Sequence, residues 1–472
     1  MCVDPSRHRS DLVTIVDFRQ HPGVVYGCQH QEPFETRATI WPVESETAKD
    51  PVAALRRQPG PVHDEARNCH TCHVPSVTAS QTLLNGPQEI ESTLAKSFNV
   101  VDLFCGTGAI AFGLTQADSS FQVVGGIDSN DAACMTAQKN HPGSAMVNAP
   151  INSFTPERFA AEIGATTVDM IVGGPPCQGF SSLRPSRGTT LDDPRNSLYR
   201  EYAKYVAALA PRVFLMENVV GLVNATHGGL LLDIVRRFER AGYRTDWRIL
   251  NAANYGVPQK RERFFLIGVR RDVKPGLEIT FPEPTHHFRG RTIGIRDRSR
   301  RVINEFSGLP AVSAWQAMSD LPSICSGKAA DHYDTRPKNA YQRKMRTASK
   351  SLSLHTAADH NKKMLTVIKH AGSSRSALPD GLVSSGYSSC YSRIDPNEPA
   401  PTITVKFTSP ASSKCIHPYD DRAITPREAA RLQSFPDHFE FAGSKTEIAG
   451  QLGNAVPPSL AACLAPSLSR YL

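Results

Sequence analysis

The sequence predicts an α/β fold in which helices cover both faces of a mostly parallel sheet. Three observations carry this prediction. From Asn99 to about Arg270, short apolar runs alternate with amphipathic segments of helical periodicity. Glycine turns follow the first of these apolar runs and also the run Val168–Val172. From residue 271 to about 425 the alternation stops and prolines and serines accumulate, which predicts a smaller, loop-rich second domain.

The individual elements are predicted in chain order from these patterns. We expect strands at Asn99–Phe104, Gln122–Asp128, Val168–Val172 and Arg212–Val219, and helices at Ala109–Gln116, Ser129–Asn140, Asn196–Ala210 and Gly228–Gly242. Two further strands, Arg244–Leu250 and Arg263–Val269, have no helix between them. They should therefore form an antiparallel pair at one edge of the sheet.

The domain boundaries follow from the same changes in pattern. We predict an N-terminal extension at 1–96, the α/β domain at 97–270, the loop-rich domain at 271–425 and a C-terminal segment at 426–472. That segment should hold a helix at Pro426–Gln433, with proline in its first turn, and a last helix after Pro457-Pro458. The extension has few apolar runs, so we expect it to be partly disordered and dispensable for activity.

The extension contains one string with metal-binding spacing. Residues 69–73, Cys-His-Thr-Cys-His, match the pattern of haem attachment and could supply zinc ligands together with Cys28 or His30. Haem attachment requires an export signal and a haem-packing core, and neither pattern is present. We therefore assign no metal site.

Composition narrows the class of protein. The net charge of +8 and the pI near 8.9 are compatible with a nucleic-acid partner without establishing one. No apolar run reaches the roughly 18 residues of a membrane span, and the start lacks the pattern of a signal peptide. Eleven scattered cysteines argue against a disulfide framework. We expect a reducing, cytoplasmic location, and association with the nucleoid if the source is bacterial.

A glycine turn follows the first predicted strand. Gly106-Thr107-Gly108 leads into a helix whose first N–H groups are free to bind a ligand. Asp128 ends the next strand, where its carboxylate can accept from both ribose hydroxyls. The spacing fits neither a dinucleotide fingerprint nor a P-loop. It predicts a cofactor that contains a nucleoside, bound at the carboxyl edge of the sheet.

A second turn, Gly-Gly-Pro-Pro at 173–176, ends the strand Val168–Val172 and is followed directly by Cys177. A thiol at a sharp strand-to-loop turn suits a nucleophile, although an isolated cysteine there is more often structural. Glu217 ends the strand Arg212–Val219, at the same edge of the sheet. A carboxylic acid beside a thiol can assist thiolate attack on a ring. The alternative role for Glu217 is structural, as a carboxylate that caps a helix N-terminus.

Two arginines open the last predicted strand. Arg261 and Arg263 are two residues apart, so they should face one side, where they could grip a carbonyl oxygen or orient the acid. The alternative is a charged edge strand.

Together these motifs resemble the DNA (cytosine-5)-methyltransferase family, in its bacterial or phage form, over about residues 98–472. The motifs that match in order are Asp-Leu-Phe-Cys-Gly-x-Gly, Gly-Gly-Pro-Pro-Cys-Gln-Gly-Phe-Ser, Glu-Asn-Val, Gln-Lys-Arg-Glu-Arg, Arg-Glu-Ala-Ala-Arg-Leu-Gln-Ser-Phe-Pro and Gly-Asn-Ala-Val-Pro-Pro. The resemblance implies a Rossmann-like, S-adenosylmethionine-dependent sheet, with residues 271–425 as the target-recognition domain.

The resemblance also implies residue roles. Cys177 resembles the nucleophile that adds to cytosine C6, Glu217 the residue that contacts N3 and the exocyclic amine, and Arg263 the residue that contacts O2, with Arg261 in support. The positions that match contacts to S-adenosylmethionine are Phe104, Gly106, Gly108, Asp128, Pro175 and Asn454. The segment Ser181–Asn196 matches a loop that closes over DNA. The acid often found after the third strand is replaced near Asn148.

The implied reaction is methyl transfer to C5 of a cytosine flipped out of a specific double-stranded DNA sequence. We expect a monomer, no membrane association, and a cognate restriction endonuclease as a partner compatible with the sequence. Three alternative functions are an RNA cytosine-5 methyltransferase on the same scaffold, an inactive DNA-binding regulator, and an exocyclic-amine methyltransferase. The long region 271–425 favours duplex DNA, and Cys177, Glu217 and Arg263 argue against an inactive protein.

Overall fold

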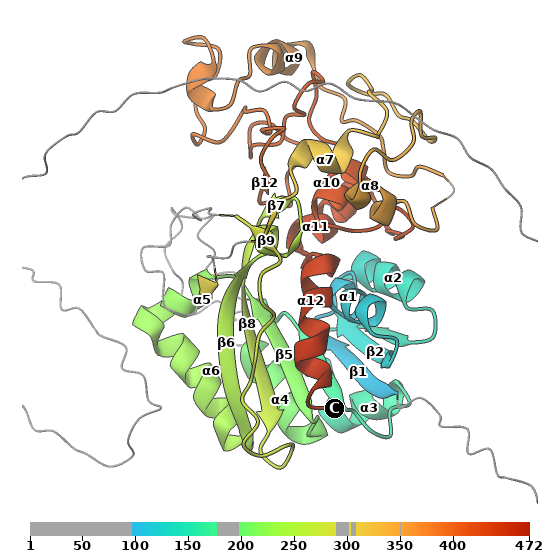
Figure 1. Cartoon of the computed structure of the whole chain (residues 1–472), viewed down its shortest axis with the longest axis vertical. Coiled ribbons are helices and arrows are strands. Elements are labelled where there is room, and N and C mark those ends of the chain that lie inside the picture. Colours follow the sequence, from blue (N-terminus) through green and yellow to red (C-terminus); the bar gives the residue numbers. More distant parts are fainter. Residues whose placement is uncertain (1–96, 177–197, 289–301, 304–307, 350) are drawn as a thin grey trace, which may run out of the picture. The chain divides into compact units, whose positions relative to one another are not determined.

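The computed structural model describes residues 97–176, 198–288, 302–303, 308–349 and 351–472 (Figure 1). These residues belong to one compact unit. The extension 1–96, with its Cys-His string, lies outside the described residues, and so do Cys177 and the segment Ser181–Asn196. The boundaries proposed at 270/271 and 425/426 stay a prediction.

Within the described residues, eight strands form one sheet in the order β10-β6-β8-β5-β4-β1-β2-β3. These strands are β1 Phe98–Leu103, β2 Phe121–Asp128, β3 Ala145–Asn148, β4 Met170–Gly173, β5 Val213–Asn218, β6 Tyr243–Asn251, β8 Glu262–Arg270 and β10 Val302–Ile303. Neighbours from β5 to β3 run parallel, and β8 runs antiparallel to both β5 and β6. The α/β fold class and the mostly parallel sheet are confirmed.

Helices cover both faces of this sheet (Figure 1). The helices around it are α1 Ala109–Ala117, α2 Asp131–Asn140, α3 Pro156–Glu162, α4 Leu198–Leu209, α5 Gly221–Asn224, α6 Gly229–Arg240 and α12 Pro458–Ser469. Alternate strand residues point to opposite faces. Val100 on β1 therefore lies in a core with α1 and α12, whereas Val101 lies in a core with α3, α4 and α6. The last helix therefore packs on the sheet beside α1 and β1.

The structure corrects two details of the predicted strands. The pair β6 and β8 is antiparallel as expected, but β10 adds a parallel strand outside β6, so the pair is one strand in from the edge. A two-residue strand carries too short a pattern to be read from sequence. Gly173 also still pairs with Leu103 and Met216, so β4 ends one residue later than the apolar run indicates.

Residues 308–425 and the C-terminal segment form a region of short elements. These elements are β11 Leu309–Pro310, which pairs with β9 His286–His287, β12 Ala400–Pro401, which pairs with β7 Gln259–Lys260, and the helices α7 Ala314–Met318, α8 Ala340–Met345, α9 Lys362–Lys369, α10 Pro426–Leu432 and α11 Lys445–Asn454. The predicted helix at Pro426 is confirmed. Thr425 caps it, and the Glu428 side chain bonds back to the Thr425 N–H. Apolar residues from α7, α10 and α11 share one core.

Helices long and apolar enough to cross a bilayer are not found in the part of the chain that the structure describes.

Candidate active site

Two backbone N–H groups, one from the turn after β1 and one from the turn after β2, bind the acid that ends β2. Gly106 N donates to Asp128 Oδ2 at 2.9 Å, and Asn130 N donates to Asp128 Oδ1 at 2.9 Å. Phe104 and Gly106 have positive φ angles of 56° and 50°, which only glycine adopts without strain. Gly108, also left-handed, then caps α1. The two predicted cofactor motifs therefore meet at one sheet edge.

The space over this turn fits a bound group. A Cβ built on Gly106 meets no atom of the described residues within 4 Å. Two buried polar atoms of the same motif, Asp102 Oδ2 and Thr107 Oγ1, have no hydrogen-bond partner within the described ranges. Buried polar atoms are normally satisfied, so unpaired ones mark a place for a polar ligand or water. The carboxylate and N–H groups here suit a nucleoside.

The two carboxyl groups at this edge differ in their surroundings. Burial raises the pKa of Asp128, and the N–H groups of Asn130 and Gly106 offset part of that rise. Burial, with repulsion from Asp128, holds the pKa of Asp102 well above its usual range. Asp102 therefore tends to keep its proton while Asp128 accepts hydrogen bonds.

The second predicted site forms where β4 and β5 end side by side. A Cβ added to Gly174 would lie 2.7 Å from Glu217 Oε2, so the turn approaches this carboxyl group closely and a larger residue would require the Glu217 side chain to shift. Arg263 Nε lies 3.0 Å from Glu217 Oε1, and the two side chains are only 14% and 12% exposed. The structure thus brings Glu217, Arg263 and the Gly-Gly-Pro-Pro turn together.

Burial raises the pKa of Glu217, and the guanidinium groups of Arg263 and Arg261 offset part of the rise. Glu217 consequently holds a proton more readily than an exposed glutamate does. A carboxyl group with a raised pKa is suited to act as a general acid or hydrogen-bond donor near neutral pH.

Asn218 is a site residue to which the sequence analysis gave no role. Its buried Nδ2 donates to the Pro175 carbonyl oxygen at 2.8 Å, and its Oδ1 accepts from Val219 N. It therefore fixes the proline turn relative to β5, next to Glu217. The Glu-Asn-Val motif already contained it, and an amide beside a functional acid is the pattern that could have found it.

The two arginines have different partners, although both were expected to face one side. Arg261 is fully buried, and its Nη1 and Nη2 donate to the carbonyl oxygens of Ile403 and Gly453 at 3.2 and 2.9 Å. Gln259, two residues earlier, accepts from Ile403 N at 2.9 Å. Arg261 thus ties the start of β8 to the segment that ends at Asn454, whose side chain is exposed. Only Arg263 pairs with the acid.

Asn148 ends β3 beside the Asp128 edge. Its Nδ2 donates to the Asp128 carbonyl oxygen at 3.3 Å, and its side chain is exposed. Within the described residues no group of three or more His, Cys, Asp or Glu side chains is arranged to hold a metal ion. Cys177, the predicted nucleophile, directly follows Pro176 and lies outside the described residues.

A mostly parallel sheet with an antiparallel strand, a glycine turn bonded to the acid of the next strand, and a proline turn beside a buried acid together define an S-adenosylmethionine-dependent methyltransferase. The family follows from comparison. Residues 98–470 match the model of the C-5 cytosine-specific DNA methylase family, and the chain belongs to it. It is an enzyme that transfers a methyl group from S-adenosylmethionine to C5 of cytosine in DNA.

Two curated relatives and one solved structure illustrate the similarity. The type II methyltransferase M.DdeI of Desulfomicrobium norvegicum is 32% identical, over 79% of this chain and 89% of that protein. M.AgeI of Thalassovita gelatinovora is 31% identical, over 78% of this chain and 98% of that protein. A protein from E. coli, assigned as a prophage DNA modification methyltransferase, matches with a TM-score of 0.61 and 26% identity, over 79% of this chain and 99% of that one.

Proposed function

We propose that the edge formed by Glu217, Arg263 and the turn through Pro175 is the site where the target cytosine reacts. The observation that carries this proposal is the buried Glu217–Arg263 pair directly against Gly174. A cytosine offers an N3 acceptor, an exocyclic amine donor and an O2 acceptor along one edge. A carboxyl group paired with a guanidinium matches that pattern, because the acid can donate and accept while the arginine donates.

Cys177, by its position directly after this turn, is the proposed nucleophile. C5 of cytosine is not nucleophilic while the ring is aromatic. Addition of the thiolate to C6 forms a C–S bond and pushes electrons toward C5, and Glu217 supports the charge that develops at N3. After methyl transfer a base removes the C5 proton, and the C–S bond breaks to release the thiolate and restore the ring.

We propose the cofactor-binding residues because the space and the polar atoms around Gly106 suit a nucleoside. Asp128 would hold the ribose hydroxyls, the N–H groups after β1 would face the nucleoside, and Phe104, Gly106, Gly108, Pro175 and Asn454 would line the remaining contacts. When bound, S-adenosylmethionine supplies a sulfonium methyl group. We assign Arg261 a positioning role, because both of its Nη atoms bond to backbone carbonyl oxygens, one of them on the residue before Asn454.

The substrate is proposed to be duplex DNA with the cytosine rotated out of the stack, since the C5 atom is inaccessible in a paired duplex. Residues 271–425 would act as the recognition domain. They contain several basic side chains near polar loops, such as Lys362 and Lys363 at the start of α9. Phosphate contacts would set the register, and base-edge contacts would set the sequence.

The cellular setting is proposed from the relatives. Both curated relatives compared above are type II methyltransferases, which belong to restriction–modification systems. We propose that this protein acts as a monomer in the cytoplasm and protects DNA from a cognate restriction endonuclease. Plasmid DNA from cells that express the protein should then resist a nuclease in the source organism's lysate that cuts unmodified plasmid.

The decisive experiment changes Cys177 and follows covalent trapping. DNA that contains 5-fluorocytosine cannot lose a C5 proton, so wild-type protein with cofactor should accumulate a covalent adduct that maps to Cys177 by mass spectrometry. Cys177→Ser should form no adduct and transfer no methyl group, while still binding DNA. Turnover in Cys177→Ser, or an adduct at another cysteine, would contradict the proposed mechanism.

A further inference from the structure

Two free thiols lie directly beneath the cofactor edge, and the methyl-transfer mechanism does not use either of them. Cys105 belongs to the glycine turn after β1, and Cys134 lies in the first turn of α2. Both side chains are buried, at 7% and 4% exposure, and they pack together with Ala137 and Met146.

The two thiols lie in one buried cluster, close enough that each shifts the pKa of the other. The Cys134 sulfur lies 3.3 Å from the Asp128 carbonyl oxygen, and Asn148 Nδ2 approaches it at 3.8 Å. Cys105 is equally tied to this edge, because its N–H donates to the Ile127 carbonyl oxygen at 3.1 Å. The thiol pair therefore lies next to both the glycine turn and Asp128, the acid that accepts a hydrogen bond from Gly106 N.

The surroundings give the two thiols different reactivity. The neighbouring Cys105 thiol lowers the pKa of Cys134, and the Asn148 amide adds to this effect. The proximity of Cys134, together with burial, raises the pKa of Cys105 well above its ordinary value. Cys134 is thus the better nucleophile, and Cys105 is a neighbouring thiol placed to resolve an oxidised sulfur.

We propose that Cys105 and Cys134 form an oxidative modification site, at which hydrogen peroxide converts the thiol pair into an intrachain disulfide that weakens cofactor binding. The Cys134 thiolate attacks one peroxide oxygen, the O–O bond breaks, and water leaves after protonation, which gives a sulfenic acid. The Cys105 sulfur then attacks this sulfur, the S–O bond breaks, and a second water leaves with the Cys105 proton. One peroxide is reduced and two thiols are oxidised, so atoms and electrons balance.

The disulfide should affect the cofactor because of where Cys105 lies. The two free sulfurs must move together to form a bond of about 2.05 Å. Cys105 directly precedes Gly106, whose N–H is bonded to Asp128, so this closure shifts the turn against the acid. The consequence rests on the cofactor site proposed above. Since coupling between two events is reciprocal, bound S-adenosylmethionine should in turn oppose disulfide formation.

The test uses the full-length chain in a Cys177→Ser background, so that the proposed nucleophile does not consume peroxide. Protein is treated with hydrogen peroxide, with and without saturating S-adenosylmethionine, and the affinity for the cofactor is measured by calorimetry before treatment, after treatment, and after dithiothreitol. We expect affinity to fall about tenfold on oxidation, to recover on reduction, and we expect the bound cofactor to slow the cross-link.

The cross-link has a clear signature in this sequence. No Lys or Arg lies between Ser97 and Gln138, so trypsin leaves both cysteines in one peptide that ends at Lys139. The disulfide makes this peptide lighter by two hydrogen atoms. Further cleavage before Asp118 and Asp128 should separate the reduced peptide but leave the oxidised fragments joined.

Cys134→Ser and Cys134→Ala in the same background should form no cross-link and keep their cofactor affinity after peroxide. Oxidation of the exposed Cys325 serves as the internal control for reagent activity. The proposal is overturned if Cys325 is oxidised while Cys105 and Cys134 stay reduced, or if the cross-link forms and affinity is unchanged. Failure of the untreated protein to bind S-adenosylmethionine would instead contradict the cofactor site itself.

Discussion

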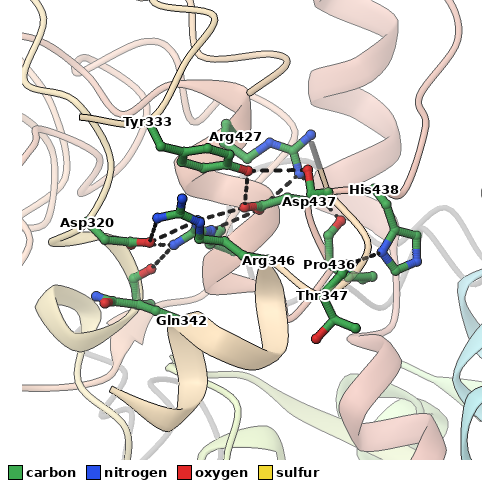
Figure 2. A network of polar contacts seen from close by, with 12 residues as sticks. Asp320, Tyr333, Gln342, Arg346, Thr347, Arg427, Pro436, Asp437 and His438 are labelled. Carbon is green, nitrogen blue, oxygen red and sulfur yellow. Dashed lines mark hydrogen bonds and ion pairs between the residues drawn. The ribbon is translucent and has the colours of Figure 1, made fainter. Parts of the chain in front are cut away.

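Two buried regions of this molecule pair carboxyl groups with arginines, and they do so in opposite ways. At the proposed catalytic edge, Glu217 forms one ion pair among the described residues, with Arg263, and burial raises the pKa of Glu217. In the network around α10, Asp437 accepts from Arg431 Nε and Nη2 at 2.8 and 2.6 Å and from the Tyr333 hydroxyl at 2.7 Å (Figure 2). Arginine contacts lower the pKa of Asp437 despite its burial.

In the α10 network both the carboxylates and the arginines have charged partners. Arg431 also bonds Asp320 at 2.5 Å, and the guanidinium of Arg346 lies 3.7 Å from the centre of the Tyr333 ring (Figure 2). Glu428, which lies on α10 itself, accepts from both Nη atoms of Arg422 at 2.8 Å. This pairing outweighs burial, so the pKa of Glu428 falls far below its usual range. Such groups stay ionised and rigid.

The number of arginine partners, and with it the direction of the pKa shift, distinguishes a carboxyl group with a structural role from one suited to catalysis. A carboxylate whose lone pairs are filled by arginines cannot take up a proton near neutral pH, so it stabilises one arrangement of the chain. A carboxyl group with fewer partners and a raised pKa can exchange a proton with a substrate. The predictions below test this distinction.

The largest expected effect is on catalysis. Glu217→Gln removes an acid that can pass a proton while keeping the size of the side chain, so kcat should fall about 10²- to 10⁴-fold. Incorporation of labelled methyl groups into DNA measures this loss. Binding of DNA and cofactor should persist, and a kcat within about tenfold of wild type would show that Glu217 is a structural partner of Arg263.

The next effect is on stability. Asp437→Asn leaves Arg427 without its charged partner and removes one of two partners from Arg431. Breaking a buried pair typically costs about 3–5 kcal/mol of the free energy of unfolding, which urea denaturation measures. Glu440→Gln breaks only the exposed pair with Lys139 and should cost less than about 1 kcal/mol. Equal losses in the two variants would remove the distinction drawn here.

The two regions should also respond to pH with opposite signs. Glu428 has a lowered pKa, so its stabilising contribution is complete above its ordinary value of 4.5 and is lost as pH falls through the folded value. The stability difference between wild type and Glu428→Gln, about 3–5 kcal/mol at neutral pH, should therefore shrink in acid. Glu217 has a raised pKa, so its protonation in acid favours the folded state. Urea denaturation of wild type, Glu428→Gln and Glu217→Gln from pH 7 to 4 measures how the free energy of unfolding of each changes with pH.

The smallest effect separates cofactor contact from backbone strain. Gly106 and Gly164 have φ angles of 50° and 66°, and a Cβ on either one meets no described atom within 4 Å. Gly106→Ala and Gly164→Ala should thus each cost about 1–2 kcal/mol of stability. Only Gly106→Ala should also weaken S-adenosylmethionine binding, by about 1–3 kcal/mol, because its methyl group enters the cofactor space. Calorimetric titration of both variants distinguishes the two effects, and equal affinities would place the cofactor elsewhere.

The sequence by itself determined the local elements and the identity of the chemistry. Apolar periodicity and glycine turns predicted β1, α1, β2 and α2 to within about two residues, and the motifs placed Asp128 and Glu217 at strand ends. These features depend on neighbouring residues in the chain, so local rules suffice for them.

Tertiary structure decided which side chains meet. Arg261 and Arg263 are two residues apart and look equivalent in sequence, yet Arg261 bonds to Ile403 and Gly453, more than 140 residues away. The Cys105–Cys134 pair and the bond from Asn218 to Pro175 likewise join separate strands and helices. The periodicity of apolar residues does not predict such contacts between distant segments. The burial that raises the pKa of Glu217 exists only once distant segments have packed together.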